Sequence, residues 1–182
     1  MSTICIDPTL YTTRPAGRRM EKETAVYALL EKLGIPYAGL DHEAVGHVES
    51  CDEVGAILGV EICKNLFLCN RRKTDFYLLM MPGKKEFRTK DLSKQIGSSR
   101  LSFADKASME RFLNVTPGSV SVMGLMNDTE NRVRLLIDRD VTAQEFIGCH
   151  PCINTSSLRI ATRDLLEKFL PHVRHAPTFV TL

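Results

Sequence analysis

Residues 59–81 read GVEICKNLFLCNRRKTDFYLLMM, two apolar runs with the basic segment RRKT between them. Both runs are rich in aliphatic and aromatic residues and are short enough for strands, and a polar segment of this length suits a hairpin turn. The stretch therefore predicts strands over 65–70 and 75–81. Lys64 and Asn65 stand at the entrance of the first strand, where a lysine is unfavourable unless its ammonium finds a partner or reaches water.

The rest of the chain mixes short helices and strands without an internal repeat. Apolar residues at helical spacing predict a helix over 20–33, which Gly34 stops, and the capping-box pair Ser50 and Glu53 predicts a short helix that Gly59 closes. Further helices are predicted over 89–97, 106–113 and 162–170, and further strands over 133–138, 158–161 and 178–182. This order predicts an α/β (α+β) fold with a mixed β-sheet flanked by helices.

The chain length and the turn residues near the start predict the domain organisation. A chain of 182 residues is long enough to bury one core, and no linker divides it. Residues 1–18 contain Pro8, Pro15 and Gly17 and predict a loosely attached N-terminal arm. Residues 19–182 are predicted to form the single domain.

Composition excludes several classes of protein. The chain is 43% hydrophobic and 25% charged, as soluble globular domains are, and no apolar run approaches the roughly 20 residues of a membrane span. The first twenty residues have no apolar segment followed by a signal cleavage site. Six cysteines in such a chain indicate reduced thiols, so we expect a cytoplasmic protein without membrane contact.

Charge is distributed unevenly, although the net charge is only +2. Residues 41–62 contain six acids and no Lys or Arg, whereas residues 64–100 contain ten bases and three acids. Such a basic stretch suits contact with nucleic-acid phosphates, and it equally suits a solvated hairpin and helix. Charge alone leaves both interpretations open.

One cysteine motif raises the question of metal or redox chemistry. Cys149 and Cys152 flank His150 in a C-x-x-C motif, which could be a redox pair or half of a zinc site. A structural zinc site needs four ligands, and the sequence has no second C-x-x-C and no H-x-x-x-H. No metal and no cofactor are therefore predicted. No histidine lies in a local nucleophile motif such as G-x-S-x-G, so nothing supports a covalent mechanism.

The remaining candidates are Lys64 with Asn65, the turn at 117–122, and residues 150–154. Each has a simple structural explanation when taken alone. The lysine can extend to water, the asparagine can satisfy a turn, and Gly118 can supply a positive φ.

Together, and in this order, these segments resemble a known family. KNLFL, an apolar hairpin, TPGSVSVMGL, VRLLID and HPCINTSSLRI follow one another as they do in the YbaK and prolyl-tRNA-synthetase-associated editing domains. The resemblance covers residues 20–182. It is closest to the free-standing branch that deacylates alanyl-tRNA(Pro), the ProXp-ala or PrdX-like proteins.

The resemblance implies a trans-editing aminoacyl-tRNA hydrolase that acts on mischarged tRNA(Pro). Alanyl-tRNA(Pro) is the expected substrate, with cysteinyl-tRNA(Pro) as the rival within the class and a noncatalytic aminoacyl-tRNA or amino-acid binding module as the rival outside it. The family's essential lysine falls on Lys64. Substrate-binding residues fall on Asn65, Gly118, Ser119, Val120, Ser121 and His150. Val122 stands where the family's G-x-x-x-P loop carries proline, and we expect the loop to accept a proline there.

The resemblance also implies the partners. The acceptor end of tRNA(Pro) is the expected ligand, prolyl-tRNA synthetase is a further expected partner, and DNA is not expected. Basic residues in the arm and in the hairpin turn are expected to contact the RNA: Arg18, Arg19, Arg71, Arg72 and Lys73.

Overall fold

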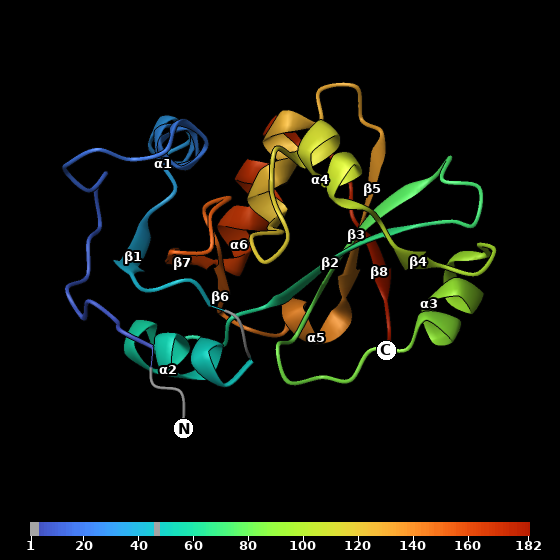
Figure 1. Ribbon diagram of the computed structural model, residues 1–182, viewed down its shortest axis with the longest axis horizontal. Helices are drawn as coiled ribbons and strands as arrows, with labels where there is room; N and C mark the ends of the chain where they lie inside the picture. The colour runs from blue at the N-terminus through green and yellow to red at the C-terminus, as the bar shows by residue number, and fades with distance from the viewer. Residues whose placement is uncertain (1–3, 46–47) are drawn as a thin grey trace.

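The computed structural model describes residues 4–45 and 48–182, whose strands form two β-sheets that lie side by side (Figure 1). A three-stranded antiparallel sheet has the order β1 (Tyr37–Asp41), β7 (Ser156–Ala161), β6 (Phe146–Cys149). A five-stranded sheet has the order β4 (Ser102–Phe103), β2 (Lys64–Cys69), β3 (Phe76–Met81), β5 (Val133–Asp138), β8 (Thr178–Val180). The helices are α1 (Glu21–Lys32), α2 (Val48–Leu58), α3 (Thr89–Ile96), α4 (Lys106–Leu113), the 3-10 helix η1 (Val122–Asn127), α5 (Arg139–Thr142), α6 (Thr162–Asp164), the π-helix η2 (Leu165–Phe169) and α7 (Leu170–His172).

The predicted hairpin is the centre of the larger sheet. β2 and β3 pair antiparallel from Lys64 opposite Met81 to Cys69 opposite Phe76, and β3 continues into parallel pairing with β5 and then β8. All six residues of β3 are buried, and they alternate between two hydrophobic clusters on opposite faces of the sheet. A strand covered on both faces explains the continuous apolar run. The prediction of an α/β fold with mixed strands and flanking helices is confirmed.

The two sheets meet where Ile62 bridges Gly148. The Cys63 amide donates to the Gly148 carbonyl at 2.9 Å, which ties the start of β2 to the end of β6. A side chain at position 148 would lie 2.6 Å from Ile62 Cδ1, and one at position 83 would collide with the Ile62 carbonyl. Glycine at 148 and 83 is therefore required by the close approach of three backbone segments.

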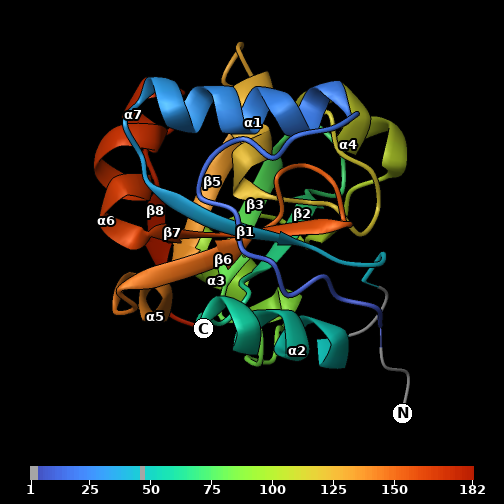
Figure 2. The same cartoon turned by 90° about the vertical axis from the view of Figure 1, so that its left-hand side faces the viewer.

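Helices cover the sheets from several sides. In Figure 2, α1 runs across the top of the smaller sheet and α2 across the bottom. The main hydrophobic cluster joins α1 to both sheets, with the fully buried rings of Tyr27, Phe67 and Phe169 among its members. Within the described residues, no helix has both the length and the apolar character that a membrane span requires.

Most predicted elements are present, with corrections. The helices at 89–96 and 106–113 match, as do Gly59 at φ +68° and Gly97 at φ +64° as helix-ending residues. Ser50 is not a cap, because α2 begins two residues earlier at Val48. The predicted helix at 162–170 is real but divided, since its middle turn is η2. The strands β1, β4 and β6 were not predicted.

The N-terminal arm is held against the smaller sheet through residues 6–11, contrary to the loose attachment expected. It runs antiparallel to the free edge of β1, with a bridge between Ile6 and His42 and another between Tyr11 and Gly39. The Tyr11 amide donates to Gly39 O at 2.9 Å, and the Gly39 amide returns a bond of 2.8 Å. The arm therefore shields an edge strand that would otherwise be open to solvent.

A buried polar pair fixes the C-terminal segment. Asp128 and His175 are 4% and 3% exposed, and His175 Nε2 donates to Asp128 Oδ2 at 2.9 Å. The same carboxylate accepts the amides of Arg132 at 2.9 Å and Val133 at 2.7 Å. His175 Nδ1 lies 2.6 Å from Val173 O, so both ring nitrogens face oxygen atoms.

We predict that Asp128→Asn lowers the free energy of unfolding by about 3–5 kcal/mol, because it breaks a buried pair whose carboxylate also accepts two backbone amides. Urea unfolding measures this as a lower midpoint at unchanged slope. Glu110→Gln, in an exposed pair with Lys106, is the control and should change stability by less than about 0.5 kcal/mol. Equal small effects of both substitutions would contradict the stabilising role of the pair.

Candidate functional site

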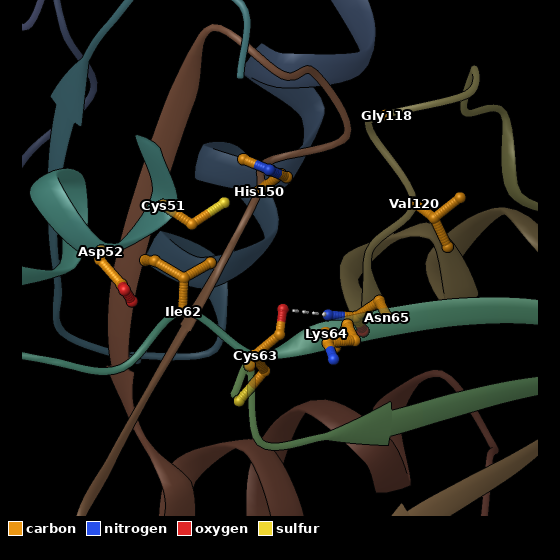
Figure 3. A pocket seen from close by; sticks show the side chains of 10 residues that line it. Cys51, Asp52, Ile62, Cys63, Lys64, Asn65, Gly118, Val120 and His150 are labelled. Carbon is orange, nitrogen blue, oxygen red and sulfur yellow. Dashed lines mark hydrogen bonds between the residues drawn. The ribbon is translucent and has the colours of Figure 1, made fainter. Parts of the chain in front are cut away.

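A pocket of about 180 Å³ lies at the junction of the two sheets (Figure 3). Its walls come from α2, from the segment that leads into β2, from the turn after β3, from the loop before η1 and from the residue after β6. The lining residues are Cys51, Asp52, Ile62, Cys63, Lys64, Asn65, Gly83, Gly118, Val120 and His150. Five of the seven residues predicted for catalysis and substrate binding therefore surround one cavity.

Lys64 is half-buried in the pocket wall, and its ammonium donates to the carbonyl oxygen of Lys85 at 2.7 Å. Among the described residues, no carboxylate lies within salt-bridge distance of this ammonium. The side chain of Lys85 is itself held at 2.8 Å by Asp138, which is fully buried, and at 2.8 Å by Asp140. The loop that positions Lys64 is thus anchored, while Lys64 keeps an unneutralised charge and two further N–H donors.

Asn65 ties the pocket loop to β2. Its Oδ1 accepts the backbone amide of Val122 at 3.0 Å, and its Nδ2 donates to Cys63 O at 3.3 Å. A proline has no amide hydrogen to donate. The expectation that the loop would accept proline at 122 is therefore revised, because this chain uses the amide of Val122 to hold the loop.

The loop before η1 presents backbone rather than side chains to the pocket. Gly118 has φ +88°, a conformation that favours glycine. The Ser119 amide is bound to Thr116 O at 2.9 Å. Within residues 4–45 and 48–182, the amides of Gly118 and Val120, two residues that line the pocket, have no protein acceptor, so these N–H groups are available to a ligand.

The two serines of this loop point away from the pocket. Ser119 is 1% exposed and its hydroxyl donates to Thr116 O at 2.9 Å. Ser121 is fully buried and its Oγ accepts the Met123 amide at 3.1 Å, as the N-cap of η1. Neither side chain lines the cavity, so the serines shape the loop.

His150 contributes an imidazole whose protonation is set by its surroundings. Its Nδ1 lies 2.9 Å from Ser156 O, and because a carbonyl can only accept, Nδ1 carries the proton. Burial lowers the pKa of His150, and the nearby His42 lowers it further, while the bond to Ser156 opposes both. The ring is therefore neutral. Its second nitrogen, Nε2, is unprotonated and is left for a ligand in the pocket.

The cysteines do not form a reactive centre. Burial raises the pKa of Cys63, Cys149 and Cys152 to about 12, so these thiols stay protonated and are poor nucleophiles and metal ligands. Cys51 lines the pocket, and burial raises its pKa as well. Among the described residues, no three His, Cys, Asp or Glu side chains are arranged to hold a metal ion.

The residues predicted to contact RNA fall into two separate places. The turn between β2 and β3 is fully exposed and lies at one end of the long axis, whereas the arm lies at the other (Figure 1). Arg19 is bound to Asp41 at 2.6 Å and to Glu23 at 2.8 Å, so its charge is already balanced inside the protein. Arg18 is exposed, and Lys73 pairs with Asp105 at 3.2 Å.

Five lining residues were missed by the sequence analysis, and one of them, Cys63, had no signal beyond its place next to Lys64. Gly83 had a signal in the Pro-Gly turn after β3, which marks a turn but not a pocket. Cys51, Asp52 and Ile62 had none, because an apolar or acidic residue on a predicted helix or connection is ordinary. Asp52 forms an exposed salt bridge with Lys84 at 3.6 Å.

Comparisons with known proteins identify the family of this chain. Residues 42–168 match the family model described as aminoacyl-tRNA editing domain. A prolyl-tRNA editing protein, ProX, of Acetoanaerobium sticklandii is 30% identical over 146 residues, 80% of this chain and 89% of that protein. A prolyl-tRNA synthetase associated domain-containing protein 1 of Danio rerio is 30% identical over 170 residues, 92% of this chain and 89% of that protein.

A solved structure shares the fold. It is described as a candidate trans-editing enzyme for prolyl tRNA synthetase and superimposes with a TM-score of 0.66 at 14% identity, covering 91% of this chain and 99% of the other. The family match extends over more than half of the chain and includes Lys64, Gly118 and His150. The prediction of an aminoacyl-tRNA hydrolase is thereby confirmed, and the chain belongs to the aminoacyl-tRNA editing domain family.

Proposed function

We propose that this protein is a trans-editing deacylase that hydrolyses the ester of mischarged tRNA(Pro), with alanyl-tRNA(Pro) as its preferred substrate. The observation that carries the proposal is the gathering of Lys64, Asn65, Gly118, Val120 and His150, distant in sequence, around one cavity. The relatives' names, which refer to prolyl-tRNA editing and to the prolyl-tRNA synthetase, support tRNA(Pro) as the RNA.

The chemistry needs a positioned water and donors for the developing oxyanion, because the ester is already activated. The free amides of Gly118 and Val120 are the donors for the ester carbonyl. Lys64 supplies a positive charge to the carbonyl or to the terminal phosphate, through the N–H groups that Lys85 does not occupy. The terminal 2′-hydroxyl of the tRNA assists the attack of water, as the resemblance implies.

His150 and Asn65 have different roles in this proposal. The unprotonated Nε2 of His150 accepts a hydrogen bond from the α-ammonium of the aminoacyl group. Asn65 acts on the substrate indirectly, since its amide holds the Val122 end of the loop that carries the donors. Asn65 is therefore a positioning residue.

Exclusion by size explains the preference for a small amino acid. The cavity of about 180 Å³ is bounded by Cys51, Ile62 and Val120, which leave space for a small side chain. A difference of one heavy atom contributes only about 1–3 kcal/mol in such a pocket. Cysteinyl-tRNA(Pro) is accordingly the rival substrate, and seryl-tRNA(Pro) belongs in the same comparison.

The exposed turn at 71–73 is the proposed contact for the acceptor stem. It lies at the opposite end of β2 from Lys64, which for six residues is about 20 Å along the strand. A stem of duplex RNA whose 3′ end enters the pocket extends over such a distance. We place the protein in the cytoplasm with its tRNA substrate, and we include prolyl-tRNA synthetase as a partner.

The observation that suggested a noncatalytic binding module has another explanation in this structure. A binding module was suggested by Val122 in place of the family's proline, which implied a loosened loop. The bond between Asn65 and the Val122 amide restrains that loop, so the substitution does not favour loss of activity.

We predict that Lys64→Met removes most deacylation of alanyl-, cysteinyl- and seryl-tRNA(Pro), lowering kcat/KM by about 100-fold or more, because a donor to the transition state is lost. Release of each amino acid from purified charged tRNA measures the effect, and alanyl-tRNA(Pro) should be hydrolysed fastest by the unmodified protein. Lys106→Met, an exposed lysine on α4, is the matched control and should leave the rates unchanged. Wild-type turnover in Lys64→Met would refute the site, and no turnover of any ester by the wild type would refute the proposed function.

We predict that Asn65→Ala and Val122→Pro each lower kcat/KM by about 2- to 10-fold, the worth of one ordinary hydrogen bond. Both changes remove the same bond, so the double variant should lose little more than either single variant. Val122→Ala keeps the amide and should retain activity while lowering stability. Additive losses in the double variant would show that Asn65 contacts the substrate directly.

We predict that replacing Arg71 and Arg72 by Gln weakens binding of tRNA and makes it less dependent on salt. The slope of log K against log salt concentration should fall by about one for each phosphate contact removed. Arg163→Gln, an exposed arginine paired with Glu167, is the control and should leave the slope unchanged. An unaltered slope in the double variant would remove the turn from the interface.

A further inference from the structure

A series of hydrogen bonds leads from His150 away from the pocket. Ser157 Oγ lies 3.3 Å from His150 Nδ1 and 2.9 Å from His42 Nε2. His42 Nδ1 in turn lies 2.7 Å from Glu43 O. Ser157 is 1% exposed and His42 is 6% exposed, and the two imidazole rings are 6.0 Å apart between centroids. Neither Ser157 nor His42 lines the pocket.

The direction of every bond in this series is determined by its two ends. Glu43 O can only accept, so His42 Nδ1 carries a proton and a neutral His42 has a bare Nε2. That bare nitrogen must accept from the Ser157 hydroxyl. The hydroxyl oxygen is then free to accept from His150 Nδ1–H, which also donates to Ser156 O.

We propose that His42 and Ser157 are positioning residues that hold His150 in the tautomer whose unprotonated Nε2 is left for the pocket. A free histidine side chain in water favours the opposite tautomer, with the proton on Nε2. The Ser156 carbonyl already opposes that tautomer, and the Ser157 oxygen, held as an acceptor by His42, adds a second partner for the Nδ1 proton. The effect of this tautomer on catalysis rests on the proposed function. The tautomer of His150 itself can be measured whether or not the protein is a deacylase.

The surroundings of the two rings favour the neutral state that the series requires. Burial lowers the pKa of His42 and of His150, and in His150 the neighbouring His42 adds to the effect. Asp41 opposes burial at His42 by favouring the charged ring, as does the bond to Glu43 O. With a proton on Nε2, His42 would donate to Ser157, and the Ser157 hydroxyl would turn towards His150. His150 Nδ1 would then accept that hydroxyl and would face Ser156 O with no proton between them.

The series also provides hydrogen-bond partners for polar atoms whose burial without partners would cost free energy. The buried His42 and Ser157 and the half-buried His150 need partners for their polar atoms. Among the described residues, each of these atoms has a partner except His150 Nε2. An acceptor left without a protein partner at the wall of a cavity is suited to a ligand N–H or to a water molecule.

Nuclear magnetic resonance of the full-length protein with ¹⁵N-labelled histidine tests the tautomer directly. Long-range ¹H–¹⁵N correlations should show a protonated Nδ1 and a bare Nε2 for both His42 and His150, assigned by His42→Gln and His150→Gln. His175 is the internal control and should show a protonated Nε2, because that nitrogen donates to Asp128. A proton on Nε2 of His150 would overturn the proposal, whatever the protein does to aminoacyl-tRNA.

Variants in the series test its consequence. Ser157→Ala should reveal an Nε2–H population of His150 and lower kcat on alanyl-tRNA(Pro) by up to about tenfold, the worth of one ordinary hydrogen bond. His42→Gln keeps an acceptor oxygen near the place of Nε2 and should retain most activity, whereas His42→Leu removes it and should behave like Ser157→Ala.

The outcomes are distinguishable. Wild-type tautomers and kcat in both Ser157→Ala and His42→Leu would overturn the positioning role. Equal loss in His42→Gln and His42→Leu, without a change in the His150 tautomer, would assign His42 a purely structural role and overturn it too. Absence of deacylation in the unmodified protein would refute the proposed function. The tautomer of His150 measured in the wild-type protein would still decide the proposal about the hydrogen-bond series.

Discussion

The site depends on one close approach of backbone, where Ile62 passes Gly148. Cys63 N bonds to Gly148 O at 2.9 Å, so Lys64, which follows Cys63, and His150, two residues after Gly148, are delivered to the same cavity. The approach is possible because position 148 has no side chain. Two separate sheets thus act as one rigid frame, and functional groups on rigid elements keep their geometry better than groups on free loops.

In the described part of the chain, the pocket combines a cation that no carboxylate neutralises with an imidazole and thiols held neutral, while its acidic lining residue, Asp52, pairs with Lys84 at 3.6 Å. Lys64 is fixed through a carbonyl and not through a carboxylate, so its charge remains available. Burial keeps His150 unprotonated and keeps the surrounding thiols protonated. In such a weakly polar cavity a charge acts over a longer range than in water. The arrangement suits stabilisation of a developing negative charge better than proton removal by the protein.

Local sequence patterns predicted those parts of the fold that depend on local interactions. The hairpin at 65–81 and the helix at 106–113 have strong periodicity and clear ends, and both are present. Strand β1 was missed because Gly39 breaks its pattern, yet Gly39 is needed there, since a side chain would collide with the ring of Tyr11. β6 is only four residues long, and its pairing with β7 is not visible in the sequence. The division into two sheets likewise depends on contacts distant in sequence.

The candidate site was predicted by motif order and not by any single residue. Lys64, Gly118 and His150 were recognised together, and the structure brings them together. The serines at 119 and 121 were grouped with them because they are adjacent in sequence, but a loop that turns its backbone to the cavity turns these hydroxyls inward. His42 and Ser157 could not be assigned from the sequence, because their role depends on a contact between β7 and the residue after β1.

The position of Val122 shows how one physical constraint can replace another. A proline restrains a loop through its fixed φ, whereas valine leaves φ free and retains an amide. Here that amide is bound by Asn65, the residue next to the functional lysine, so the loop and the start of β2 are connected through a hydrogen bond. A hydrogen bond restrains the loop only while its partner stays in place. A proline ring restrains φ without any partner. The loop that carries the backbone donors is consequently coupled to the strand that carries the cation, and a displacement of either one is transmitted to the other.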